Sequence, residues 1–137
     1  MRGPFNINLT SLILRVGFGL YMLIGHGLPK LEKFLVGGEI KFSTLFGLPA
    51  KLYLGIAIFA EFLCAAMVAF GFRSRLFVLP LIMLMLVIVM FVKSGAGWVG
   101  CGSRELAMMY LMPFICIFVL GSGKISVDEL MDRSPAA

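Results

Sequence analysis

The chain has 137 residues, of which 61% are hydrophobic and only 14% charged, and it contains 16 glycines. Soluble domains are about 45–50% apolar and about 25% charged, so an ordinary soluble domain and a disordered chain are both excluded. Three cysteines cannot form a closed disulfide set, and a net charge of +5 is typical of membrane-protein loops beside anionic headgroups. We therefore expect a lipid bilayer, and no nucleic acid, as the main partner.

The first two apolar runs each carry ionisable residues. A helix needs about 20 apolar residues to cross the hydrocarbon core, with a working range of about 17–25. The run 9–28 meets this length and is interrupted only by Arg15 and His26. The run 50–72 also meets it and holds Glu61 near its middle. Both runs are predicted to be transmembrane helices.

The last two apolar runs complete the predicted fold. The run 76–92 has no charged residue, whereas the run 105–121 is short and holds Pro113, which should kink a helix. The sequence therefore predicts an all-α integral membrane four-helix bundle, with a single transmembrane domain over residues 1–137. Because the third helix carries no ionisable group, we expect it to face lipid or a second copy in a homo-oligomer.

The connections predict how the bundle meets its interfaces. Residues 30–34 are typical of a short amphipathic continuation of the first helix, within an interfacial loop over 29–49. Residues 122–137 form a polar C-terminal tail. The total of basic residues on the two sides does not decide orientation, but Arg73 and Arg75 lie at helix ends in a very short link. We therefore expect a multi-pass membrane protein with both termini in the cytoplasm.

Ionisable residues inside the predicted helices are the candidate functional residues, because such groups are costly in a membrane and usually face a bundle interior. Arg15 and His26 lie on one helix face, since eleven steps of about 100° come close to three full turns. Glu61 shares its face with small residues, which allow close helix approach. Similar estimated depths predict an Arg15–Glu61 ion pair near the membrane centre. The alternatives are that Arg15 extends to its own interface and that Glu61 is structural.

A second polar group is predicted at the loop side of the membrane. His26, Lys30 and Glu105 all lie near this face, and Glu105 begins a stripe of Met109, Met112 and Cys116 at helical spacing. The alternatives are a solvated or capping His26 and a Glu105 that only compensates the helix dipole. We take Arg15, His26, Lys30, Glu61 and Glu105 as candidate ligand-binding or proton-relay residues.

Sulfur-containing residues give weaker signals. Cys101 follows a glycine in a predicted flexible loop and is a candidate reactive thiol, although no CxxC motif accompanies it. Met108 and Met112 have helical spacing, and thioethers suit Cu(I), but methionine also fills irregular helix packing. No metal site is therefore expected.

Several short segments, in their order and spacing, resemble the DoxX family over residues 9–128. They are LRVGFGL at 14–20, HGLPKL at 26–31, Glu61 followed by GFRSR at 71–75, ELA at 105–107, YL at 110–111 and GSGKIS at 121–126. The family comprises small four-helix bacterial membrane proteins and takes its name from proteins similar to a subunit of thiosulfate:quinone oxidoreductase. The resemblance carries over Arg15, His26, Glu61 and Glu105 as matched positions without assigned catalytic roles.

The resemblance implies a membrane subunit of a quinone-linked oxidoreductase system in the bacterial inner membrane. The expected ligand is a quinone, with no intrinsic cofactor. A partner subunit would carry the flavin, haem or metal that transfers electrons. Two alternatives stay open, namely a non-catalytic structural or assembly subunit and a transporter that binds a small solute or a lipid. Whether the chain is itself an enzyme is left undecided by the sequence.

Overall fold

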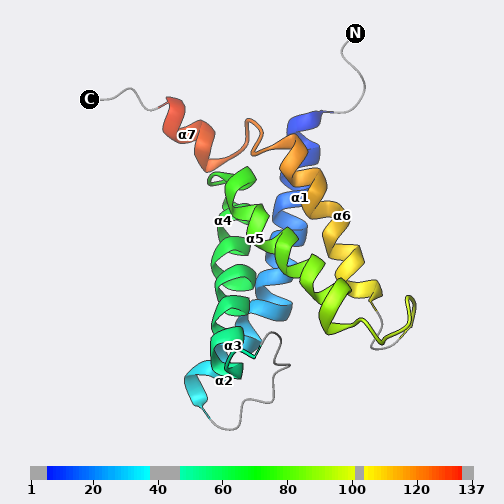
Figure 1. The fold of residues 1–137 in the computed structure, drawn as a ribbon. Coiled ribbons are helices and arrows are strands. Elements are labelled where there is room, and N and C mark those ends of the chain that lie inside the picture. The colour runs from blue at the N-terminus through cyan, green and yellow to red at the C-terminus, as the bar shows by residue number, and fades with distance from the viewer. Residues whose placement is uncertain (1–5, 38–46, 101–103, 134–137) are drawn as a thin grey trace.

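A computed structural model describes residues 6–37, 47–100 and 104–133, and the secondary structure in these ranges is helical, with no strand (Figure 1). In the described residues, adjoining helical segments form four rods that pack into a bundle, and a short helix follows them. A rod is a run of helical segments with no loop between them. The chain is thus an all-α bundle, as the apolar runs predict.

The first rod is longer than its apolar run. The Asn6 side chain caps its start by accepting a hydrogen bond from the backbone N–H of Asn8 at 3.1 Å. A π-helical turn ends at Gly27, two residues before Pro29, which lacks a backbone N–H donor. The rod ends at Val36, so the amphipathic segment does continue the first helix. Its three continuous parts are α1 (Ile7–Met22), η1 (Leu23–Gly27) and α2 (Leu28–Val36).

The second and third rods also contain π-helical segments. Gly71 ends the second rod with a φ of +78°, a conformation that favours glycine, and the chain turns at once into the third. Glu61 lies in the π-helical part of the second rod, as His26 does in the first, and such segments are frequent at functional sites. The parts are α3 (Ala50–Ile58), η2 (Phe59–Cys64), α4 (Ala65–Phe70), α5 (Ser74–Val87) and η3 (Ile88–Val92).

The last rod and the segment after it bring the chain back to its starting end. Helix α6 (Glu105–Leu120) runs unbroken through Pro113. A short helix α7 (Val127–Arg133) lies at the same end of the bundle as the start of α1 (Figure 1). The region predicted to be a polar tail therefore contains a helix.

Each rod packs against two others, which closes the bundle. Helix α1 contacts α4 and α6, and α5 contacts the same two helices from the other side. Gly19 lies so close to α4 that a Cβ there would be 3.0 Å from Cβ of Ala69. The small residues predicted to share a face with Glu61 are buried, namely Ala57, Cys64 and Ala65.

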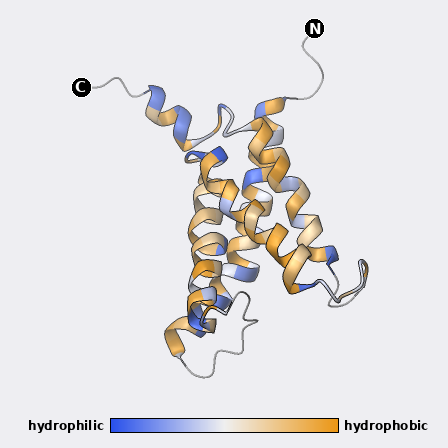
Figure 2. Ribbon diagram, viewed as in Figure 1, coloured by the Kyte–Doolittle hydropathy of each residue, from blue (hydrophilic) through white to orange (hydrophobic). Residues whose placement is uncertain are grey.

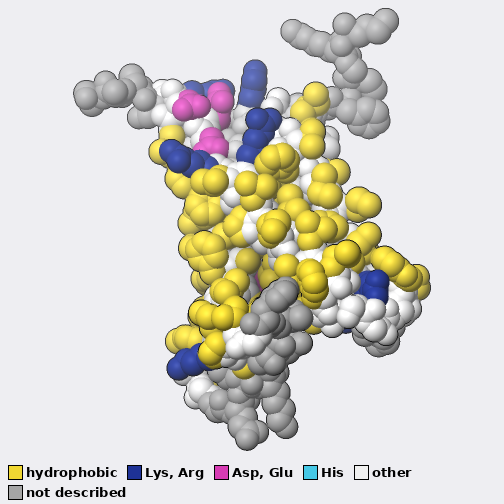
Figure 3. Space-filling view, in the orientation of Figure 1, with side chains coloured by type: hydrophobic (Ala, Val, Ile, Leu, Met, Phe, Trp, Pro, Cys, Tyr) yellow, Lys and Arg dark blue, Asp and Glu magenta, His cyan; other side chains and the backbone are white. Residues whose placement is uncertain are grey.

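The distribution of polar and apolar side chains is that of a membrane protein. Among the described residues, three helices are long and apolar enough to cross a membrane, and α6 is a shorter apolar helix. The ribbon is apolar along its middle, and on the face shown charged side chains gather towards the two ends (Figures 2 and 3). Arg15 and Glu61, in contrast, are buried inside the bundle. Lipid therefore solvates the apolar outer surface, and the interior holds the ionisable groups.

Candidate functional site

The buried charges form two separate groups, so the predicted Arg15–Glu61 pair is wrong. Glu61 forms its ion pair with Lys30, and no salt bridge of the described residues involves Arg15. The guanidinium of Arg15 lies beside Gly71, roughly 15 Å beyond Glu61 along the second rod at about 1.5 Å per residue. The arginine side chain extends towards the end where the chain begins, whereas Glu61 faces the opposite half of the bundle.

Arg15 is held by the segment that follows α6. Its side chain is fully buried, and Nη2 donates a hydrogen bond to the carbonyl of Ile125 at 2.7 Å. The hydroxyl of Ser11 donates to the carbonyl of Gly121 at 2.6 Å and lies 3.4 Å from Nε of Arg15. The Arg15 side chain thus extends towards its own end of the bundle, where the segment after α6 covers it.

Asp128 joins the segment after α6 to the link between the second and third rods. Its carboxylate accepts hydrogen bonds from the backbone N–H of Arg73 at 2.9 Å and 3.0 Å and from the hydroxyl of Ser122 at 2.6 Å. The link between the second and third rods and the segment after α6 are thus joined through one carboxylate. We call this group, which consists of Ser11, Arg15, Gly121, Ser122, Ile125 and Asp128, the Arg15 cap. It joins the ends of several helices, and we interpret it as structural.

The second group lies deeper in the other half of the bundle. Glu61 is only 2% exposed, and its carboxylate pairs with Nζ of Lys30 from α2. His26 lies one turn before Lys30, is half-buried, and lines the same cavity as Lys30 and Glu61. Gly27 lets the two rods meet here, since a Cβ on it would lie 2.5 Å from the carbonyl oxygen of Glu61. The structure therefore brings three of the predicted residues together.

These residues line a cavity of about 260 Å³ inside the bundle. Its walls come from all four rods, and its polar groups are surrounded by methionine and aliphatic side chains. Lys93, at the end of the third rod, is a lining residue that the sequence did not indicate. The full lining is Met22, His26, Lys30, Glu61, Met85, Ile88, Lys93, Leu106, Ala107 and Tyr110.

Tyr110 is the second lining residue that the sequence analysis missed. It is 4% exposed, and its ring meets that of His26 edge to face at a centroid distance of 5.5 Å. Its phenol oxygen is buried and has no hydrogen-bond partner among the described residues. Buried polar groups are nearly always paired, so this hydroxyl is available to a ligand. A lone phenol in an otherwise apolar helix is the signal that could have identified it.

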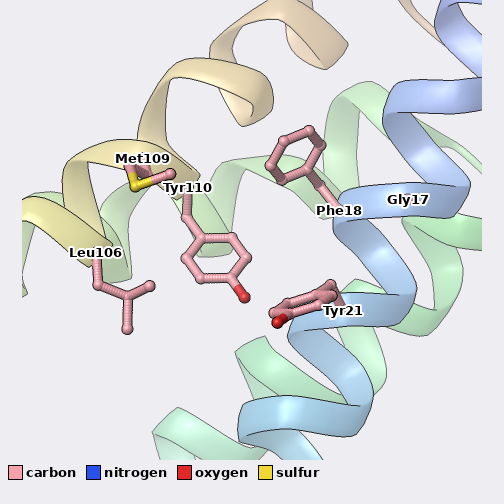
Figure 4. A pocket seen from close by; sticks show the side chains of 6 residues that line it. All are labelled: Gly17, Phe18, Tyr21, Leu106, Met109 and Tyr110. Atoms are coloured by element: carbon pink, nitrogen blue, oxygen red, sulfur yellow. The ribbon is translucent and has the colours of Figure 1, made fainter.

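An apolar groove adjoins the cavity between α1 and α6 (Figure 4). Its volume is about 430 Å³, and it shares Leu106 and Tyr110 with the cavity. The lining residues are Gly17, Phe18, Tyr21, Leu106, Met109 and Tyr110. The polar cavity therefore lies next to an apolar groove that has aromatic walls.

Glu105 is not among the residues that line the cavity, although the next residue along the chain, Leu106, is. Glu105 is exposed at the start of α6 and accepts a hydrogen bond from the backbone N–H of Gly100 at 3.1 Å. The rest of its stripe is exposed too, because α6 buries the face that contains Tyr110 and Phe114. The candidate thiol Cys101 lies outside the described residues.

Metal coordination has no obvious set of ligands in the part of the chain that the structure describes. No group of three or more His, Cys, Asp or Glu side chains there could hold a metal ion. The polar groups that line the cavity are the amines of Lys30 and Lys93, the Glu61 carboxylate, the His26 imidazole and the Tyr110 phenol.

The fold and the cavity define a small polytopic membrane protein with a polar chamber inside its bundle. The DoxX family model matches residues 10–94, which is more than half of the chain and includes His26, Lys30, Glu61 and Lys93. The chain belongs to the DoxX family. No curated protein and no solved structure matches it.

Replacing Tyr110 by phenylalanine should leave the free energy of unfolding unchanged or raise it by up to about 1 kcal/mol. The reason is that the substitution removes a buried hydroxyl without a partner and keeps the ring packing. Thermal unfolding in detergent measures this, with Tyr21→Phe as the control, because the Tyr21 side chain is exposed. A clear loss of stability would show that the Tyr110 hydroxyl is satisfied in the ligand-free protein.

Proposed function

We propose that this membrane protein is a subunit of a quinone-linked oxidoreductase system and that its cavity binds a quinone head group. One observation carries the proposal. The buried Tyr110 phenol has no partner, and it lies in a cavity shared with His26 and the Lys30–Glu61 pair. A polar chamber inside an apolar bundle suits a ligand with hydrogen-bonding atoms on an apolar body.

The residues present fit a ring with two carbonyl groups. Such a ligand offers hydrogen-bond acceptors. Donors come from three different rods, namely His26 and Lys30 from the first, Lys93 from the third and Tyr110 from the last. The volume of about 260 Å³ is close to the lower end of small-molecule pockets, at about 300–1,000 Å³, and so suits a small ring rather than a large cofactor. The aromatic face of Tyr110 and the side chain of Met22 supply the apolar contact for that ring.

The side chains that line the cavity would accept and release the protons. A bound quinone supplies two-electron redox chemistry that consumes or releases protons. Glu61 and His26 line the cavity and are positioned to hold protons beside it. The electrons would come from a partner subunit with a flavin, haem or metal centre.

We place the end with the Arg15 cap in the cytoplasm of a bacterial cell.

The substitution His26→Ala should weaken binding of a quinone analogue by about 5- to 150-fold, which corresponds to the loss of about 1–3 kcal/mol from one hydrogen bond. The measurement is equilibrium binding to the full chain purified in mild detergent, together with mass spectrometry of quinone that co-purifies with it. His26 is half-buried at the cavity wall, so folding should suffer less than binding.

The matched control is Glu105→Gln, which changes a charged residue outside the cavity and should bind the analogue like the parent. If the parent binds no quinone analogue, or if His26→Ala binds as tightly as Glu105→Gln, the proposed function is wrong. A non-catalytic structural subunit would then be the better interpretation.

A further inference from the structure

We infer that the groove between α1 and α6 binds a hydrocarbon tail, and that a ligand in the cavity is a long-tailed amphiphile that enters from the bilayer. This inference rests on the proposed function for the head group and adds the part of the molecule that selects among ligands. The groove and the cavity share Leu106 and Tyr110, so one molecule can occupy both.

The chemistry of the groove suits an apolar chain. Phe18 and Tyr21 line it from α1, and Leu106 and Met109 line it from α6 (Figure 4). The ring centroids of Tyr21 and Tyr110 are 6.5 Å apart, and no hydrogen bond of the described residues involves the Tyr110 hydroxyl. The aromatic walls therefore offer an apolar path beside the buried Tyr110 phenol, which a head group could use.

The groove opens towards the lipid and not only towards water. Tyr21 is 71% exposed and Met109 is 61% exposed, and both lie along the apolar rods that face the bilayer. A tail that follows the groove away from Tyr110 would therefore reach the acyl chains without crossing the polar ends of the bundle. Lateral entry needs no opening of the helix ends.

Gly17 is the position in the groove at which a side chain can be added without disturbing the packing of the bundle. A Cβ on Gly17 would meet no atom within 4 Å, whereas a Cβ on Gly19, two residues further, would lie 3.0 Å from Cβ of Ala69. Gly19 therefore serves helix contact, and the absent side chain of Gly17 leaves the groove open. The two glycines have the same residue type for different reasons.

A single amphiphile explains the two hollows better than a partner helix. A partner helix laid on this face would cover the exposed Tyr21 and Met109, but it would leave the adjoining polar chamber without a function. A molecule with a polar head and an apolar tail uses both, with the head beside the buried phenol and the tail along the aromatic wall.

The test compares two quinone analogues with the same head group, one with a long isoprenoid tail and one with a methyl group in its place. The parent should bind the long-tailed analogue more tightly. Gly17→Leu should weaken binding of that analogue at least about tenfold, equivalent to losing the burial of roughly two methylene groups, and leave the short analogue unaffected. The control is Gly55→Leu on α3, where a Cβ also meets nothing within 4 Å. Unfolding temperatures of both variants show whether the bundle is intact.

Three results would overturn the inference while head-group binding stands. They are equal affinity of the parent for both analogues, unchanged binding of the long-tailed analogue by Gly17→Leu, and an equal loss for both analogues in an intact Gly17→Leu protein. If the parent binds neither analogue, the proposed function itself fails, and the tail site fails with it.

Discussion

Replacing Lys30 by methionine is expected to lower the free energy of unfolding by about 3–5 kcal/mol, because it leaves the Glu61 carboxylate buried without its cation. Glu61 is 2% exposed and lies in the middle of the second rod, so its side chain cannot reach an interface. The lysine is 23% exposed and can turn towards water when its partner is lost. Glu61→Gln should therefore cost less than Lys30→Met.

A double-mutant cycle measures the coupling. The double variant Lys30→Met with Glu61→Gln should lose less free energy of unfolding than the two single variants lose together. The reason is that it removes both charges of the pair, so neither is left without its partner. The measurement is the thermal or denaturant unfolding of all four proteins in one detergent. Additive losses would mean that the two side chains do not interact.

The same cycle with Arg15 serves as the control. Arg15 and Glu61 lie in different halves of the bundle, and Arg15 donates to the carbonyl of Ile125 rather than to a carboxylate. Arg15→Met and Glu61→Gln should therefore be additive within about 0.3–0.5 kcal/mol. A strong coupling there would restore the sequence-based pairing and contradict the structure.

The parts of the fold that the sequence predicted are those that depend on local chemistry. Run length and apolarity are enough to indicate a membrane helix, because the backbone must satisfy its own hydrogen bonds in lipid. The 100° spacing correctly placed Arg15 and His26 on the inward face of the first rod. The small residues around Glu61 correctly indicated a close helix contact.

The partners of the buried charges could not be predicted in the same way. The depth estimate for Arg15 and Glu61 assumed straight helices with fixed ends and gave no direction for a long side chain. The residues that hold Arg15 come from the segment after α6, and Ile125 is 110 positions away in the sequence. Only the tertiary structure brings such a segment over the arginine.

The error on the last rod has a different cause. Helix α6 is apolar on every side, so periodicity cannot tell which face is buried, and the stripe from Glu105 was chosen for its charge. Packing against α1 and α5 instead buries Tyr110 and Phe114. The sequence therefore predicted Glu105 as a site residue, whereas the cavity contains Tyr110 instead. Both differences have one cause, the rotation of α6 about its axis.

Gly27→Ala should lower the free energy of unfolding by an amount near the upper end of the range of about 1–3 kcal/mol that overpacking typically costs. The added Cβ would lie 2.5 Å from the carbonyl oxygen of Glu61 and 3.0 Å from Cα of Phe62, which are backbone atoms that cannot turn aside. The two π-helical segments must then move apart, and that movement would separate Lys30 from Glu61. We therefore expect a second effect, a loss of quinone-analogue binding.

Gly25→Ala is a closely matched control, since it lies two positions earlier in the same π-helical segment and its Cβ would meet no atom within 4 Å. Alanine is favoured over glycine in helices by about 1 kcal/mol, so this variant should be as stable as the parent or slightly more so. Unfolding in detergent and analogue binding, measured on both variants, separate helix propensity from the contact with Glu61. Equal behaviour of the two variants would contradict the close contact between η1 and η2, and with it the geometry that brings His26 and Lys30 to Glu61.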